Sequence, residues 1–134
     1  MLRFGISSLV LGIPAMLTML SGSAAQAQQG AQRTVLERYD LSVPGHEGLL
    51  VETVLPPGAK EPRHTHPGDI FVYVMEGNIT LHADGKPDQT LKTGEVFFVP
   101  AGQIHAADNP SAVPVKLLVT FFVEKGKPLT THVQ

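Results

Sequence analysis

The sequence predicts an all-β domain, and three observations support this prediction. Apolar stretches are short, rich in valine, phenylalanine, leucine and threonine, and bounded by Gly, Pro, Asn and Asp. No window combines a helical period of apolar residues with helix caps. Many short strands at close spacing are typical of a β-sandwich or a small barrel. We expect strands over residues 34–40, 48–55, 70–75, 78–82, 95–99 and 115–123.

The N-terminal region has the pattern of a secretory signal peptide. A basic start precedes an apolar stretch over 4–20, and Ala25-Gln26-Ala27 fits a cleavage site. Gly12 and Pro14 within the apolar stretch disfavour the alternative, an uncleaved membrane anchor. We therefore expect periplasmic or secreted localisation, with no membrane association after cleavage. The expected divisions are a signal peptide over 1–27, a flexible segment over 28–33 and one folded domain over 34–134.

Charge and cysteine content narrow the function classes. The chain of 134 residues has a formal net charge of −2 and no basic run, so nucleic acid is not an expected partner. It contains no cysteine, which excludes disulfides, thiolate metal ligands and a cysteine nucleophile. A mature domain of this length is sufficient for one hydrophobic core.

Three histidines carry the strongest chemical signal. His64 and His66 are one residue apart on a segment expected to be extended, so their side chains point to the same face. The turn at residues 100–102 ends one strand and returns the chain, with His105, onto the next. An imidazole from a neighbouring strand can meet the first pair. Three imidazoles around one point form a metal site with open coordination positions.

Glycine and proline residues surround these histidines at fixed offsets, in an arrangement that resembles the two motifs of the cupin superfamily. The family's second motif, G-x5-P-x-G-x2-H-x3-N, is matched by Gly94, Pro100, Gly102, His105 and Asn109. The first, G-x5-H-x-H-x(3,4)-E-x6-G, is matched at Gly58, His64, His66 and Gly77. The resemblance covers residues 49–122. It implies a double-stranded β-helix, an antiparallel barrel related to the jelly roll, with a metal inside one end.

The first motif departs from the family pattern at its metal-ligand glutamate. Ile70 and Phe71 occupy the two positions where that glutamate is expected, and neither can bind a metal. Asp69 is the nearest carboxylate, but strand alternation directs it to the face opposite the histidines. A bulge at Pro67-Gly68 would re-aim it. Whether Asp69 replaces the glutamate is left open, and the predicted ligands are His64, His66 and His105.

The resemblance also implies a cofactor and a chemistry. Members that lack the glutamate, such as cysteine dioxygenase and acetylacetone dioxygenase, hold iron with three histidines. Three neutral imidazoles leave the charge of a divalent ion uncompensated, which strengthens its hold on an anionic ligand. Ligand count does not identify the ion, and an exported site binds whichever ion is available outside the cytoplasm. We expect one divalent transition metal: zinc, iron, manganese, nickel or copper.

Two functions fit this site. The first is an exported mononuclear-metal cupin acting as an oxygenase or lyase on a small anionic or enolisable metabolite. The second is a periplasmic module that binds a metal or a small ligand without turnover. The lack of an evident general base favours the second function, and no catalytic residue is assigned. A partner-binding protein with a vestigial pocket is a third alternative. Small single-barrel members often dimerise through their sheets, so a homodimer is expected.

Structural roles are expected for the remaining candidates. Arg63 is expected to point away from the metal, and Gln103 either to shape a turn or to bond a ligand at the mouth. An apolar pocket wall on the histidine face is expected from Ile70, Val72 and Val74. Surface positions are expected for His46, His82 and His132. Packing roles in the core or along a sheet are expected for Tyr73, Phe97 and Phe98.

Overall fold

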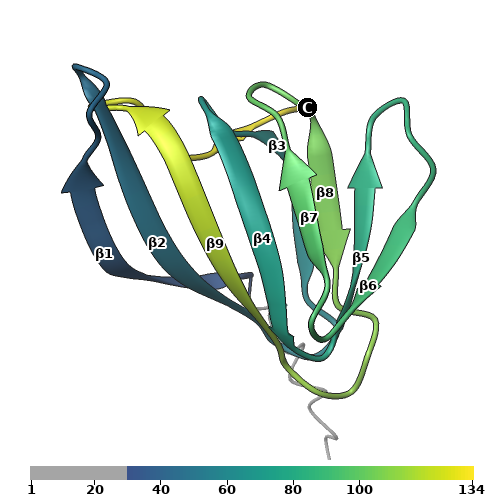
Figure 1. Cartoon of the computed structure of the whole chain (residues 1–134). Coiled ribbons are helices and arrows are strands. Elements are labelled where there is room, and N and C mark those ends of the chain that lie inside the picture. Colours follow the sequence, from purple (N-terminus) through teal and green to yellow (C-terminus); the bar gives the residue numbers. More distant parts are fainter. Residues whose placement is uncertain (1–29) are drawn as a thin grey trace, which may run out of the picture.

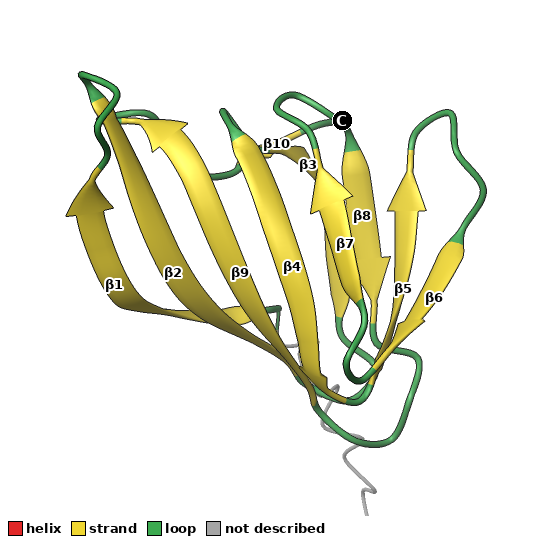
Figure 2. Cartoon of the chain, in the orientation of Figure 1, coloured by secondary structure: helices red, strands yellow, loops and turns green. Residues whose placement is uncertain are grey.

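Strands and turns make up the regular structure of residues 30–134, the residues that the computed structural model describes (Figure 2). No helix occurs in this range, so none of these residues forms a helical membrane span. The signal peptide expected over 1–27 lies outside the described residues. The strands are β1 (Gln32–Asp40), β2 (His46–Leu55), β3 (Lys60–Thr65), β4 (Asp69–Glu76), β5 (Asn78–Ala83), β6 (Gln89–Lys92), β7 (Val96–Val99), β8 (His105–Asp108), β9 (Val115–Glu124) and β10 (Thr131–His132).

Two five-stranded antiparallel sheets form the fold. The strand order is β1-β2-β9-β4-β7 in the first sheet and β10-β3-β8-β5-β6 in the second. In Figure 1 the sheets come together at the lower end of the view and separate toward the upper end, like the walls of an open barrel. The all-β prediction is confirmed. Except for β1-β2 and β5-β6, neighbours within each sheet are not consecutive in sequence, so strands far apart along the chain contribute to one interior.

Strict alternation of buried and exposed side chains places the core between the sheets. Every second residue of β2 and β9 is buried. Ile70, Val72 and Val74 of β4 are at most 3% exposed, which confirms that they face inward. Each fully buried side chain of this size contributes about 1.5–3 kcal/mol. Further core residues are Leu49, Val51, Leu55, Ile79, Val99, Val115, Leu117, Val119, Phe121 and Val123.

Alternation also explains where the aromatic residues lie. Of the three expected to pack, Phe97 alone reaches the core. Tyr73 and Phe98 are on the outer face of the first sheet, 43% and 47% exposed. There Phe98 contacts Phe71 at a centroid distance of 5.0 Å, and Phe71 contacts Phe122 at 6.2 Å. The first sheet therefore presents an outer aromatic cluster, Phe71, Phe98 and Phe122.

The residue ranges expected to form strands did not include four strands of the structure: β3, β6, β8 and β10. They are short or polar, and β3 contains both a proline and several charged residues. Their hydrogen-bonded neighbours hold them extended, so apolar content does not reveal them. β1 begins at Gln32, two residues before the expected start at Thr34.

Asn109 joins the loops at the closed end of the barrel. Its side chain is fully buried, and its Nδ2 group donates to the carbonyls of Leu55, Pro56 and Val113 at 2.8–3.1 Å. Its Oδ1 accepts from the backbone N–H and the hydroxyl of Ser111. Asn109, a residue of the second motif, therefore fixes the turn that follows β8 and connects it to the end of β2.

Asn109→Ala is expected to destabilise the fold by about 3 kcal/mol, because several buried carbonyls lose their donor at once. Urea unfolding measures this free energy. Ser111→Ala is the control, and it should cost only about 1 kcal/mol because the donors of Asn109 remain. Equal costs for the two variants would contradict the role given to Asn109.

Candidate metal centre

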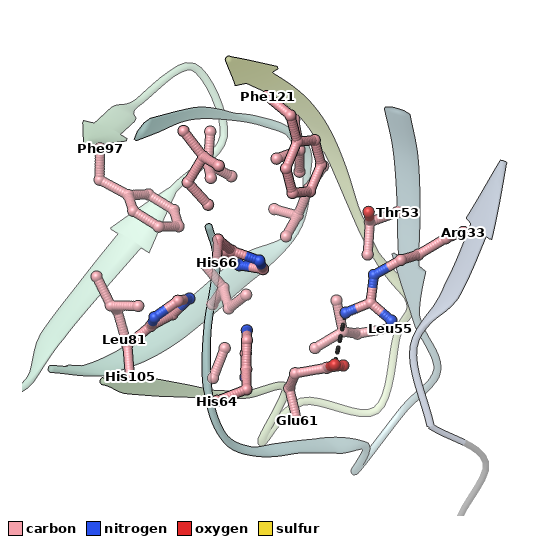
Figure 3. Close-up of a pocket in the computed structure, with 16 residues that line it drawn as sticks. Arg33, Thr53, Leu55, Glu61, His64, His66, Leu81, Phe97, His105 and Phe121 are labelled. Carbon is pink, nitrogen blue, oxygen red and sulfur yellow. Dashed lines mark hydrogen bonds and ion pairs between the residues drawn. The ribbon is translucent and has the colours of Figure 1, made fainter. Parts of the chain in front are cut away.

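Pairing of β3 with β8 brings the three predicted histidines together. His64 lies directly opposite His105 across this pair, and His66 follows β3 on the same face (Figure 3). One ring nitrogen from each histidine lies within 4.8 Å of the others. The ring centroids are 4.2–5.0 Å apart, and the three residues are only 3–5% exposed. The predicted convergence of the three side chains is confirmed.

A backbone carbonyl orients each of the three rings. Nδ1 of His64 lies 2.7 Å from the carbonyl oxygen of Pro62. Nδ1 of His105 lies 2.9 Å from that of Gln103. Nδ1 of His66 lies 2.6 Å from that of Leu129, near the C-terminus. A carbonyl only accepts, so each Nδ1 carries the proton and each Nε2 keeps a free lone pair.

Burial keeps the three rings neutral. Loss of solvation lowers the pKa of His66 to about 4, despite its bond to the Leu129 carbonyl, which acts in the opposite direction. The same cause lowers the pKa of His64 and of His105. At neutral pH these rings are therefore uncharged, which is the protonation state that binds metals. Three fixed neutral donors in a buried group match the requirements of a divalent transition metal.

The histidines lie at the wall of a pocket between the sheets. The pocket opens to solvent, and the centres of water-sized molecules can occupy about 50 Å³ of it. Most of its lining is apolar, and Phe121 meets the His66 ring edge-on at a centroid distance of 5.2 Å. An apolar wall lowers the local dielectric and strengthens electrostatic interactions inside the pocket. The expected apolar character is confirmed for Ile70 and Val72, which line the pocket, whereas Val74 is buried in the core and does not line it.

Asp69 does not replace the missing glutamate in this structure. Its Oδ1 accepts a hydrogen bond of 2.9 Å from the backbone N–H of Ala101, on the exposed side of β4. In the pairing of β4 with β9, Asp69 lies opposite Phe122, and the register continues without a break through Ile70. Ile70 therefore points to the pocket, and Asp69 points away from it. Gly68 approaches β9 so closely that an added Cβ would lie 1.9 Å from the Phe122 carbonyl oxygen, which explains the glycine there.

Two charged pocket residues were missed by the sequence analysis: Arg33 and Glu61. Glu61 is three residues before His64, so simple alternation places it on the opposite face. A register irregularity between these two residues adds a bulge that turns both inward. Pro62 in this short strand was the available signal, because proline within a sheet marks edges and bulges. Arg33 lay in the segment expected to be flexible, but it belongs to β1.

Other candidates lie outside the group of three. Arg63 points outward and pairs with Asp84, as expected. Gln103 donates to the carbonyls of Asp84 and Ile104, which supports the turn role. His132 is exposed on β10, whereas His46 is half-buried at the start of β2 rather than fully exposed.

Comparison with known proteins identifies the family. A model of the cupin domain matches residues 51–121, and the chain belongs to the cupin family. A double-stranded β-helix domain from Klebsiella pneumoniae superimposes with a TM-score of 0.62 at 20% identity, over 78% of this chain and 85% of that one. The predicted double-stranded β-helix is confirmed.

Named relatives differ in what they do. The chain is 29% identical over 120 residues to the tetracenomycin polyketide synthase protein TcmJ of Streptomyces glaucescens, covering 89% of this chain and 78% of that protein. It is 29% identical over 76 residues to an oxalate-binding protein of Thermotoga maritima, covering 56% of this chain and 62% of that protein. Plant germin-like proteins are also similar, and the chain spans less than half of their length.

His82 lies outside the metal group, between two carboxylates. Its Nδ1 is 2.8 Å from Asp88 and its Nε2 is 3.1 Å from Asp108. The hydrogen bond to Asp88 is the main cause that raises the pKa of His82. Because the folded-state pKa is raised, the ion pairs stabilise the fold fully below pH 6.5 and lose this effect as pH rises through the folded-state pKa. The partners are solvent-exposed, so the contribution is below about 1 kcal/mol.

Asp88→Asn is expected to lower the pKa of His82 toward its ordinary value, because the amide removes the negative charge. An NMR titration of the imidazole signals measures this pKa directly. Asp84→Asn, which affects the pairing of Arg63 instead, is the control and should leave the His82 titration unchanged. An unchanged His82 pKa in Asp88→Asn would show that the ion pair does not form in solution.

Proposed function

We propose that this protein is an exported cupin that holds one divalent transition metal through His64, His66 and His105 and binds a small anionic or enolisable molecule at it. One observation carries the proposal: three buried imidazoles are each fixed by a carbonyl at Nδ1, which leaves three Nε2 atoms facing one another. Such outer hydrogen bonds fix the tautomer and orientation of metal-binding histidines.

The chain's own residues define what the site can do. The three imidazoles bring no charge, and Ile70 stands where other cupins have a glutamate, so the ion's charge is available to the ligand. A bound divalent ion would supply Lewis-acid polarisation of a ligand oxygen, and a redox-active ion would add dioxygen chemistry. The apolar walls exclude water from the bound molecule. This combination supports an oxygenase or lyase.

Similar proteins favour the same class of ligand. An oxalate-binding relative and a polyketide synthase relative point to small oxygen-rich molecules, one anionic and one built from enolisable carbonyls. Zinc, iron, manganese, nickel and copper all accept three imidazole ligands. We propose a periplasmic or secreted location from the signal-peptide pattern over residues 1–27.

A binding module without turnover is the second candidate. The pocket contains one carboxylate, Glu61, among its described lining residues, and an ion pair with Arg33 engages it. This carboxylate is thus occupied by a structural contact and is not presented to a ligand, which favours binding over catalysis. Activity separates the two candidates, since both require the same metal site.

We expect protein recovered from the exported fraction to have the mass of a chain that starts at Gln28. It should contain about one transition-metal ion per chain. His105→Ala should lower the metal content at least about tenfold, because two imidazoles remain from three. Elemental analysis measures the metal content of the wild type and of the variant. His46→Ala is the control, since His46 does not line the pocket, and it should keep the full metal content.

Metal content that survives His105→Ala would contradict the site. With the native metal in place, dioxygen uptake or product formation on a panel of diketones, thiols and small acids would support an enzyme. Tight binding of one of these molecules with no turnover would support the binding module.

A homodimer remains part of the proposal, and the outer aromatic cluster is the surface that it would bury. Exposed aromatic residues in mutual contact are enriched at protein interfaces. Phe98→Glu is expected to halve the mass measured by sedimentation in solution, because a buried charge opposes association. Val113→Glu, at an exposed loop residue, is the control and should leave the mass unchanged. A wild-type protein with the mass of one chain would rule out the homodimer.

A further inference from the structure

We propose that Arg33 binds a second, distal carboxylate of the metal-bound ligand, which makes the site selective for small dianionic acids. This inference rests on the proposed function and adds the substrate class to it. Arg33 lines the pocket together with the three histidines, and it is the only lysine or arginine among the described lining residues. Figure 3 places its guanidinium on the side of the pocket opposite Phe97.

Strand register explains why an arginine from an edge strand enters the pocket. Arg33 of β1 lies directly opposite Thr53 of β2, and directly opposed residues place their side chains on the same face of a sheet. Thr53 is 5% exposed and lines the same pocket. The side chain of Arg33 is therefore directed to the interior, although 36% of its surface remains accessible.

Glu61 holds the guanidinium but leaves part of it free. Nη2 of Arg33 donates to Oε1 of Glu61 at 2.5 Å, and the described residues provide its side chain with no second hydrogen bond. A guanidinium has five N–H donors arranged to bind a carboxylate through two parallel hydrogen bonds. The remaining donors of Arg33 are thus available to a ligand, with Glu61 acting as the positioning residue.

Charge within the pocket favours a dianion. Arg33 and Glu61 cancel each other, and the histidines are neutral, so a divalent ion leaves two positive charges uncompensated. An acid with one carboxylate at the metal and one at Arg33 neutralises this excess.

A second ion pair on the same strand provides a matched control. Arg38 of β1 pairs with the buried Glu47 at 3.0 Å, but neither residue lines the pocket. Arg38→Gln therefore removes a comparable ion pair from β1 without changing the pocket. An effect shared by Arg33→Gln and Arg38→Gln would reflect anchoring of the edge strand, whereas an effect confined to Arg33→Gln would reflect ligand binding.

The test compares ligands that differ only in the distal carboxylate. Zinc-loaded protein is titrated calorimetrically with 2-oxoglutarate against 2-oxopentanoate, and with malate against 2-hydroxybutyrate. In at least one pair, wild type is expected to bind the dianion at least about tenfold more tightly, from charge-assisted hydrogen bonds. Arg33→Gln should abolish this preference, with a smaller loss of affinity for the monoanion, because the charge of Glu61 is then uncompensated. Arg38→Gln should keep the preference.

Several results would overturn the inference. Wild type with no preference in either pair would do so, as would a preference that survives in Arg33→Gln. If Arg33→Gln does not fold, Arg33→Lys decides, because a point charge cannot make two parallel hydrogen bonds, and an undiminished preference would refute the role. Zinc stoichiometry is measured before any ligand is added. Wild type without zinc would refute the proposed function itself, whereas bound zinc with no Arg33 effect would refute this inference alone.

Discussion

The irregular pairing of β3 with β8 is the constraint on which the site depends. A bulge between Glu61 and His64 changes the phase of β3, so that a carboxylate and an imidazole three residues apart share one face. The same pairing places His64 opposite His105. Without the bulge Glu61 would face solvent, and the pocket would lose the group that holds Arg33. A local backbone irregularity therefore determines both the charge and the polarity of the interior.

Backbone groups, rather than other side chains, prepare the histidines. Each Nδ1 is bound to a carbonyl from a different part of the chain, at Pro62, Gln103 or Leu129. Carbonyls cannot titrate, so the tautomer of each ring is independent of pH changes among neighbouring side chains. The backbone N–H of Gly102 also donates to the carbonyl of His66, which connects the second motif's turn to the first motif's ligand. The two motifs are thus one structural unit.

Local features of the sequence predicted the fold class and the convergence of the three histidines, because strand alternation and motif spacing act over a few residues. The spacing of the histidines and one turn were sufficient to identify His64, His66 and His105. Glu61 was missed because the bulge reverses its direction, and a one-residue change of phase leaves little trace in composition. Arg33 was missed because an edge strand pairs on one side only and carries a polar sequence. Both residues depend on partners far away in sequence.

The bond from His66 to Leu129 has a consequence for the order in which the protein matures. Leu129 is 63 residues after His66, so one ring of the trio is oriented by a segment that is synthesised well after it. The backbone N–H of Val133 also bonds to the carbonyl of Arg63, beside the first ligand. The three rings therefore reach their final geometry only after the chain has been made as far as Leu129 and has folded. A chain cut before Leu129 would leave the His66 ring without the carbonyl that orients it.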